Sequence, residues 1–220
     1  MAHALSGLAS ARLGHIPLPF WGCAVRYSAN LTAGALKPAE SRVIADLLLR
    51  GVSGADWKAA IEQENCLQAK SIATGKRLAR LIRDRLAPFD PPFWELIRDS
   101  ASPVVQQALL AAAVKHSPLL GDFLDLVVRE QYRRFAPNLP FTLWEDYLLD
   151  CRGRDSEMPW WNDSTRRRLR SSVYLCLAQA GFLENTRSLK LQPVFLATPV
   201  LRYLESRDER LVLRCLQVSP

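Results

Sequence analysis

Long apolar segments are missing from this sequence. The longest run without a charged residue spans residues 100–114, and it contains Gln106 and Gln107. A helix needs about 20 apolar residues to cross a bilayer, so the sequence predicts no membrane span. The apolar N-terminus also lacks the basic residues that open a secretory signal peptide. We therefore expect a soluble, cytoplasmic protein.

Histidine is scarce, and cysteine follows no metal-binding pattern. The three histidines, His3, His15 and His116, lie far apart in the sequence, and the five cysteines are widely spaced with no C-x-x-C pair. Zinc sites require clustered ligands at short spacings. The sequence thus predicts neither a metal nor a cofactor, and free cysteines fit a reducing cytoplasm.

Recognisable catalytic motifs are absent as well. The chain contains no Walker A loop, no G-x-G-x-x-G, no G-x-S-x-G and no H-E-x-x-H. Acidic residues such as Asp122, Asp125 and Glu130 fall on a predicted helix without a histidine or cysteine partner. Because nothing marks a pair of carboxylates for hydrolysis, we expect a protein that is not an enzyme.

What the chain has in excess is positive charge. Its 220 residues are 49% hydrophobic, enough for a sizeable core, and carry a net charge of +7. Residues 65–85 hold six basic residues and one acid, whereas the flanking segments are slightly acidic. Such a local concentration favours an anionic partner such as nucleic acid. A merely basic soluble protein fits the overall charge equally well.

Helical periodicity runs through most of the chain and predicts a mainly α fold. Pro38 is placed to open a first helix, and Gly51 ends it. A second helix begins near Ser53 or Ala55 and ends at about Glu64. The remaining predicted helices span residues 71–86, 93–99, 103–115, 118–134, 141–151, 164–180 and 199–206.

Prolines 88, 91 and 92 mark a predicted boundary between two small helical domains. Residues 1–22 form a flexible lead-in, residues 23–88 a helix-turn-helix-like domain, and residues 89–220 a C-terminal helical domain. Within the latter, residues 189–192 and 194–196 are spaced for a short β-hairpin, which would make it winged-helix-like. Pro193 weakens that prediction, because proline cannot donate to a strand ladder.

The helix over residues 71–86 has two faces at 100° per residue. One face is apolar, and its members are Ile72, Gly75, Leu78, Ala79, Ile82 and Leu86. The opposite face carries Lys76, Arg77, Arg80 and Arg83, with Lys70, Ser71 and Thr74 near the N-terminus, where backbone N–H groups favour phosphate. Regularly spaced cations suit a DNA backbone. The alternative is an ordinary solvated helix face.

A second basic cluster, Arg166, Arg167, Arg168 and Arg170, follows Trp160 and Trp161. Asp163 or Ser164 is the expected N-cap, and Gly181 suits the C-terminal cap. Cations in a first helical turn oppose the helix dipole, which a bound anion would offset. Alternatively, Asp155, Glu157 and Asp163 neutralise the cluster. The tryptophans can stack on bases or fill a core or a domain junction.

Several segments, in this order, resemble the BrxA family, the small helical A component of bacterial BREX (bacteriophage exclusion) systems. They are Leu31–Leu36 with Glu40-Ser41, Trp57 with Glu64–Gln68, Lys70-Ser71, Arg85-Leu86, Lys115–Phe123, Trp161 with Ser164-Thr165, and Ala180–Leu183. The resemblance implies an all-helical cytoplasmic protein that works beside other BREX subunits and binds double-stranded DNA. The resemblance does not identify which residues contact DNA, so the predicted contacts rest on charge and helical phase.

The predicted function is accordingly a DNA-binding accessory protein of a phage-defence system. The predicted contacts are Lys70, Ser71, Thr74, Lys76, Arg77, Arg80, Arg83, Arg166, Arg167, Arg168 and Arg170. The alternative function is a protein–protein adaptor whose basic face meets an acidic subunit of the same complex.

Overall fold

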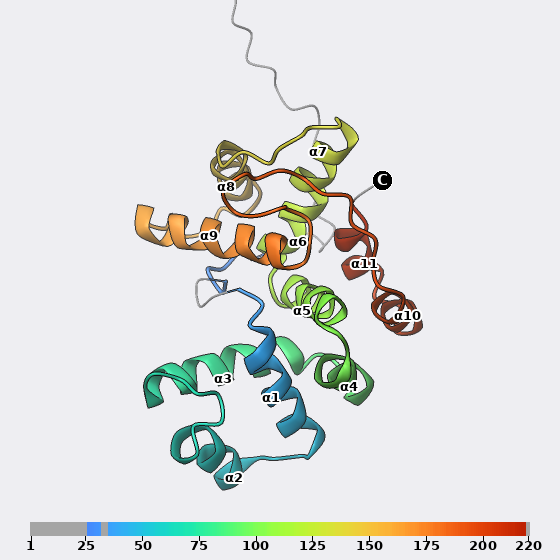
Figure 1. The fold of residues 1–220 in the computed structure, drawn as a ribbon. Coiled ribbons are helices and arrows are strands. Elements are labelled where there is room, and N and C mark those ends of the chain that lie inside the picture. The colour runs from blue at the N-terminus through green and yellow to red at the C-terminus, as the bar shows by residue number, and fades with distance from the viewer. Residues whose placement is uncertain (1–25, 32–34, 219–220) are drawn as a thin grey trace, which may run out of the picture.

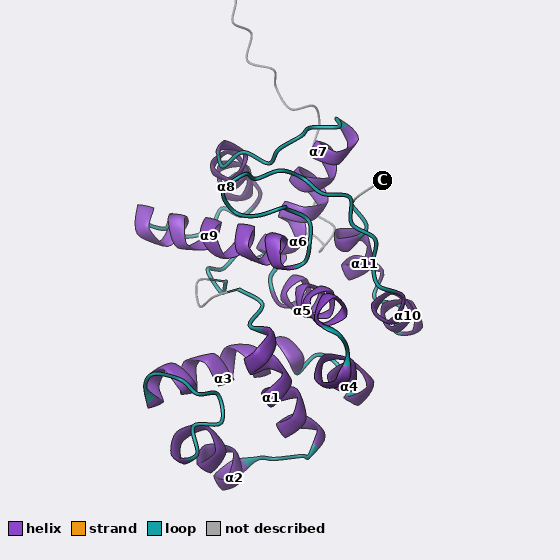
Figure 2. Ribbon diagram, in the orientation of Figure 1, coloured by secondary structure: helices purple, strands orange, loops and turns teal. Residues whose placement is uncertain are grey.

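The computed structural model describes residues 26–31 and 35–218, and these are built from helices and loops (Figures 1 and 2). The mainly α prediction is confirmed. The predicted lead-in over residues 1–22 lies outside the described residues. Within them, no helix is long and apolar enough to traverse a bilayer.

The first helices follow the sequence signals closely. α1 (Pro38–Leu49) begins with Pro38 after Lys37, whose φ is 55°, and Gly51, with φ 67°, ends the turn that follows it. α2 (Gly54–Lys58) continues into a π-helical segment, η1 (Ala59–Gln63), before the chain reaches α3 (Ile72–Leu86).

The remaining helices match the predicted segments, with one addition. The predicted helix over residues 118–134 is continuous but contains a π-helical turn in its middle, and α11 was not predicted. The elements are α4 (Pro91–Asp99), α5 (Ser102–His116), α6 (Pro118–Asp122), η2 (Phe123–Val128), α7 (Arg129–Arg133), α8 (Thr142–Arg154), α9 (Asp163–Gln179), α10 (Thr198–Ser206) and α11 (Arg210–Leu216).

Helix α5 lies at the centre of the molecule (Figure 1). Every residue from Ala108 to Val114 is buried, because α1, α3 and α4 pack on one side of the helix and α6, α9, α10 and α11 on others. α1 also packs along α4, so the helices before and after residues 88 and 89 share apolar contacts. The predicted division into two domains stays a prediction.

The predicted β-hairpin is wrong. No strand forms among the described residues, and residues 189–192 do not pair with residues 194–196. Instead, Leu191 N donates to Pro137 O at 2.9 Å, while Gln192 N donates to Phe182 O at 3.0 Å. Residues 189–192 therefore use their backbone groups on the loops before α8 and after α9. The winged-helix-like prediction is therefore also wrong, because it depended on this hairpin.

The segment before α1 ties α3 to α9. Leu36 N donates to Gln179 Oε1 at the end of α9 (3.0 Å), and Ala35 O accepts from Arg85 Nη1 near the end of α3 (3.1 Å). The C-terminal ends of both helices thus meet this segment beside α5. From there both helices extend toward the same side of the molecule, the left in Figure 1.

Histidine 116, at the C-terminal end of α5, should make stability depend on pH. Burial, and then the neighbouring Arg85 charge, lower the pKa of His116 below its ordinary 6.5. Below pH 6.5, His116 therefore binds a proton more readily in the unfolded chain than in the folded protein. Acidification then favours the unfolded state. We expect the urea midpoint to fall between pH 7.5 and 5.5, and to fall less in His116→Gln. Equal pH dependence in both proteins would contradict this.

Candidate nucleic-acid interface

The N-terminus of α3 is capped by Ser71. Ser71 Oγ accepts from Thr74 N at 3.2 Å and donates to Thr74 Oγ1 at 3.0 Å, so both hydroxyls are engaged in the cap. Lys70 lies exposed immediately before it. The first turn of α3 holds no acidic residue, so its backbone N–H groups and Lys70 present an uncompensated positive end.

The two faces of α3 are largely as predicted. Gly75, Ala79, Ile82 and Leu86 are buried. Ile72 is 57% exposed, so the apolar stripe begins one turn later than its periodicity indicates. The four predicted cations, Lys76, Arg77, Arg80 and Arg83, are all exposed.

Arg85 is the basic residue of α3 that helical phase left unassigned. It is only 3% exposed, and burial lowers the pKa of its guanidinium. The sequence did contain a signal for this burial: Arg85 lies three residues after Ile82 and directly before Leu86, on the margin of the apolar face. Arg85 is therefore a structural cation rather than a surface one.

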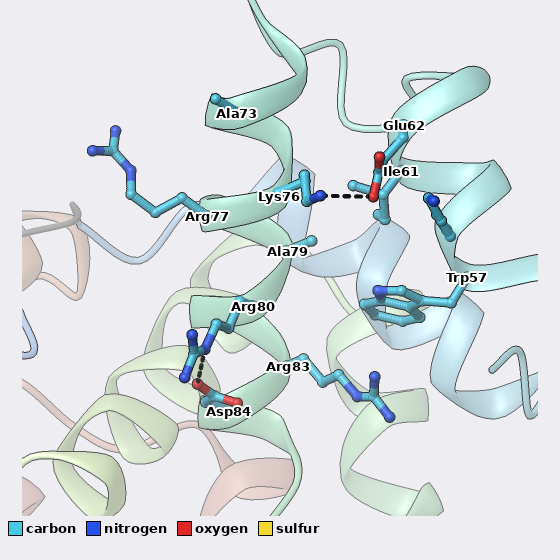
Figure 3. Close-up of a pocket in the computed structure, with 11 residues that line it drawn as sticks. Trp57, Ile61, Glu62, Ala73, Lys76, Arg77, Ala79, Arg80, Arg83 and Asp84 are labelled. Atoms are coloured by element: carbon cyan, nitrogen blue, oxygen red, sulfur yellow. Dashed lines mark ion pairs between the residues drawn. The ribbon is translucent and has the colours of Figure 1, made fainter. Parts of the chain in front are cut away.

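The exposed cations of α3 point in two directions (Figure 3). Lys76 Nζ pairs with Glu62 Oε1 of η1 at 3.0 Å, and the Arg83 guanidinium lies 4.7 Å from the centre of the Trp57 ring of α2. Arg77 points away from both and has no acidic partner among the described residues. Arg80 lies 3.7 Å from Asp84, but both are largely solvated, so the pair is weak.

The second basic cluster is also divided. Arg166 Nη1 and Arg170 Nη1 lie 3.7 and 3.4 Å from the carboxylate of Glu145 on α8, and Arg166 also pairs with Asp163. Arg167 and Arg168 are exposed and form no close ion pair in the part of the chain that the structure describes, although the Arg167 charge also helps to lower the pKa of Asp163. Two of the four arginines are therefore held against the protein, and two are available to a ligand.

Part of the positive charge of the cluster over residues 166–170 is neutralised by Glu145, which was not predicted to do so. Asp163 contributes as predicted, and its bond to Arg166 lowers the pKa of its carboxyl. Asp155 does not contribute, because it is buried and accepts from Tyr27 N at 2.9 Å. Glu145 lies more than twenty residues before the arginines, so no local sequence signal identified it. Its role follows from the packing of α8 beside α9.

The caps of α9 differ slightly from prediction. Asn162, not Asp163 or Ser164, is the N-cap, and its Oδ1 accepts from Thr165 N at 2.9 Å. Gly181 adopts φ 88° after the last turn, and Phe182 N reaches back to Leu177 O at 2.9 Å. This closure confirms the predicted C-terminal glycine.

The two tryptophans before α9 have different environments. Trp161 packs against the core, one of the roles considered from the sequence. Trp160 is 44% exposed, with the guanidinium carbons of Arg152 and Arg166 at 5.2 and 4.6 Å from its ring centre. These cation–π contacts help to hold Arg166 in place.

A groove of about 900 Å³ separates α3 from α2 and η1 (Figure 3). Its lining includes apolar side chains and both signs of charge. The lining residues are Trp57, Lys58, Ile61, Glu62, Ala73, Lys76, Arg77, Ala79, Arg80, Arg83 and Asp84. No group of three or more histidine, cysteine or carboxylate side chains within residues 26–31 and 35–218 is arranged to hold a metal ion.

Comparison with known proteins gives consistent matches over most of the chain. The BrxA family matches residues 25–208. The BREX protein BrxA of Paramagnetospirillum magneticum (strain ATCC 700264 / AMB-1) is 47% identical over 194 residues, covering 88% of this chain and 98% of the relative. The BREX protein BrxA of Escherichia coli O9:H4 (strain HS) is 35% identical over 182 residues, covering 81% and 85%.

A solved structure matches as well. The crystal structure of an uncharacterized protein from Magnetospirillum magneticum superposes with a TM-score of 0.83 at 46% sequence identity. The match covers 89% of this chain and all of that one.

Proposed function

The chain belongs to the BrxA family of BREX proteins, and we propose that it is a non-enzymatic accessory protein of a phage-defence system that binds the backbone of double-stranded DNA. The observation that supports this proposal is a set of exposed cations that form no close ion pair among the described residues, on and beside two helices that extend toward the same side. They are Lys70, Arg77, Arg167 and Arg168.

The eleven predicted contacts take different parts in this proposal. Arg80 joins the free cations, because its solvated pair with Asp84 costs little to break. Ser71 and Thr74 act through the helix terminus that they cap, where backbone N–H groups attract phosphate. Lys76 and Arg83 lie toward the groove, and Arg166 and Arg170 lie against α8, so these four contribute charge near the duplex rather than direct contacts.

Phosphate contacts without base readout make binding dependent on salt and indifferent to sequence. Each neutralised phosphate releases counterions, so the logarithm of the binding constant falls by roughly 0.9 per contact for each tenfold rise in salt. Arginine can also read guanine edges, but the proposal rests on phosphate contacts alone. We therefore expect similar affinity for unrelated duplexes.

The test is a fluorescence anisotropy titration of the full chain with two labelled duplexes of unrelated sequence, repeated over a series of salt concentrations. Equal affinities and a steep linear salt dependence are expected. A protein that binds neither duplex at a low salt concentration, about 50 mM, contradicts the proposal. Recovery of an acidic BREX subunit after nuclease treatment, with no DNA binding, would favour the adaptor role instead.

A further inference from the structure

The groove between α3 and the α2–η1 segment has properties that a DNA backbone does not require. Trp57 and Ile61 lie four residues apart on one wall, so both side chains face inward, and Ala73 and Ala79 line the other wall. Ile61 and Ala79 are buried, Trp57 is half-buried and Ala73 is exposed. The groove floor is thus apolar and accessible along the side of Ala73.

The rim of the groove is charged, and cations predominate. Lys58 lies on one wall, and the other wall carries Lys76, Arg77, Arg80 and Arg83. Glu62 and Asp84 are the only acidic side chains that line the groove. An apolar floor within a mainly cationic rim complements a ligand that is apolar on one side and acidic on its edges.

The wall that carries Trp57 departs from regular helical geometry. α2 passes directly into η1, a π-helical segment. Such segments are rare and are frequently found at functional sites. Here the π-helical turn carries Ile61 and Glu62, which supply part of the floor and part of the rim.

We infer that this groove docks an acidic amphipathic helix from a protein partner. A helix laid between two helices can insert apolar side chains at i, i+3 or i+4, and i+7 against Trp57 and Ile61. Its carboxylates then meet Lys58, Lys76 and Arg83 on the rim. Arg83, already over the Trp57 ring, would lie beside the apolar anchor.

A nucleic acid backbone fits the same groove poorly. Phosphates and sugars offer no apolar side chain to cover Ile61 and Ala79, and Glu62 and Asp84 would face the phosphates. Arg77 and Arg80 line the groove as well as belonging to the predicted DNA contacts, but the Arg77 guanidinium points away from Trp57 (Figure 3). The groove therefore provides a second site that goes beyond the proposed DNA binding and does not depend on it.

The test is photo-crosslinking in cells that carry the complete defence system. p-Benzoylphenylalanine replaces Ala73, which is exposed at the groove, or Arg168 as a matched exposed position on α9. After irradiation and nuclease treatment, the attached peptide is identified by mass spectrometry. We expect position 73, and not position 168, to capture a segment with net negative charge and apolar residues at helical spacing.

Charge reversal then separates this site from DNA binding. Lys76→Glu combined with Arg83→Glu should lower the yield of the adduct about tenfold, because rim charges act on partner choice, and reversing the captured segment's acids to lysine should restore it. Arg167→Ala with Arg168→Ala should weaken duplex binding and leave the adduct intact, because neither residue lines the groove. A nucleic acid adduct at position 73, a captured segment without acidic amphipathic character, or no protein adduct there would overturn the inference.

Discussion

A protein that lacks Arg77, Arg80, Arg167 and Arg168 is expected to lose most of its affinity for duplex DNA while remaining folded. All four side chains are exposed. Arg80 pairs with the solvated Asp84, and the Arg167 charge acts on the exposed Asp163, so neither arginine is held against the core. Replacing them with alanine removes available cations from α3 and α9 without disturbing the core.

The size of the loss follows from counterion release. If each arginine neutralises one phosphate, four substitutions flatten the salt slope by about 3.6, at roughly 0.9 per contact. At about 0.1 M salt this corresponds to a loss on the order of a thousandfold. Either pair alone, Arg77→Ala with Arg80→Ala or Arg167→Ala with Arg168→Ala, should flatten the slope by about half as much, and should do so equally on all sequences.

The control has the same net charge with the substitutions placed elsewhere. Arg133, Arg134, Arg202 and Arg210 are also exposed, on or next to α7, α10 and α11. Replacing these four with alanine should reduce long-range attraction slightly and leave most of the salt slope. Equal losses in the two quadruple variants would show that net charge alone attracts DNA and that α3 and α9 do not form the contact surface.

Arg85→Ala is expected to lower the free energy of unfolding by about 2–4 kcal/mol. The substitution leaves a cavity where α3, α5 and α9 meet, and Ala35 O loses the donor that ties the segment before α1 to α3. Urea denaturation followed by circular dichroism measures the change. DNA binding by the molecules that remain folded should be little altered.

Arg80→Ala is the matched control for this prediction. It removes the same side chain from the same helix, five residues earlier and on the solvated face. We expect its urea midpoint to match that of the unmodified protein, while its DNA binding weakens. A stable Arg85→Ala protein would mean that the buried guanidinium contributes little beyond its own desolvation, as happens for some buried charges.

The positions of all helices except α11, and several of their ends, were available from the sequence. Pro38 opens α1, α3 begins beside Ser71 and Gly181 closes α9 as predicted. These signals are local, because a cap or a proline acts on backbone groups within about one turn. The division of α3 into a buried and a cationic face followed from helical phase for the same reason.

What each charged side chain does was decided by the tertiary structure. Arg85 is buried and Arg77 is free, although both belong to the basic helix. Arg166 and Arg170 meet Glu145, a residue that only the packing of α8 beside α9 brings close. The backbone of residues 189–192 bonded to Pro137 and Phe182 rather than to a hairpin partner.

The sequence by itself therefore determined all helices but α11, several of their ends and the concentration of positive charge in residues 65–85. The tertiary structure decided which cations are free to meet a ligand, and it created the groove between α2–η1 and α3. The physical reason is the sequence separation over which each effect acts. Backbone propensity and helical phase act within a few residues, whereas burial and ion pairing depend on neighbours from any part of the chain.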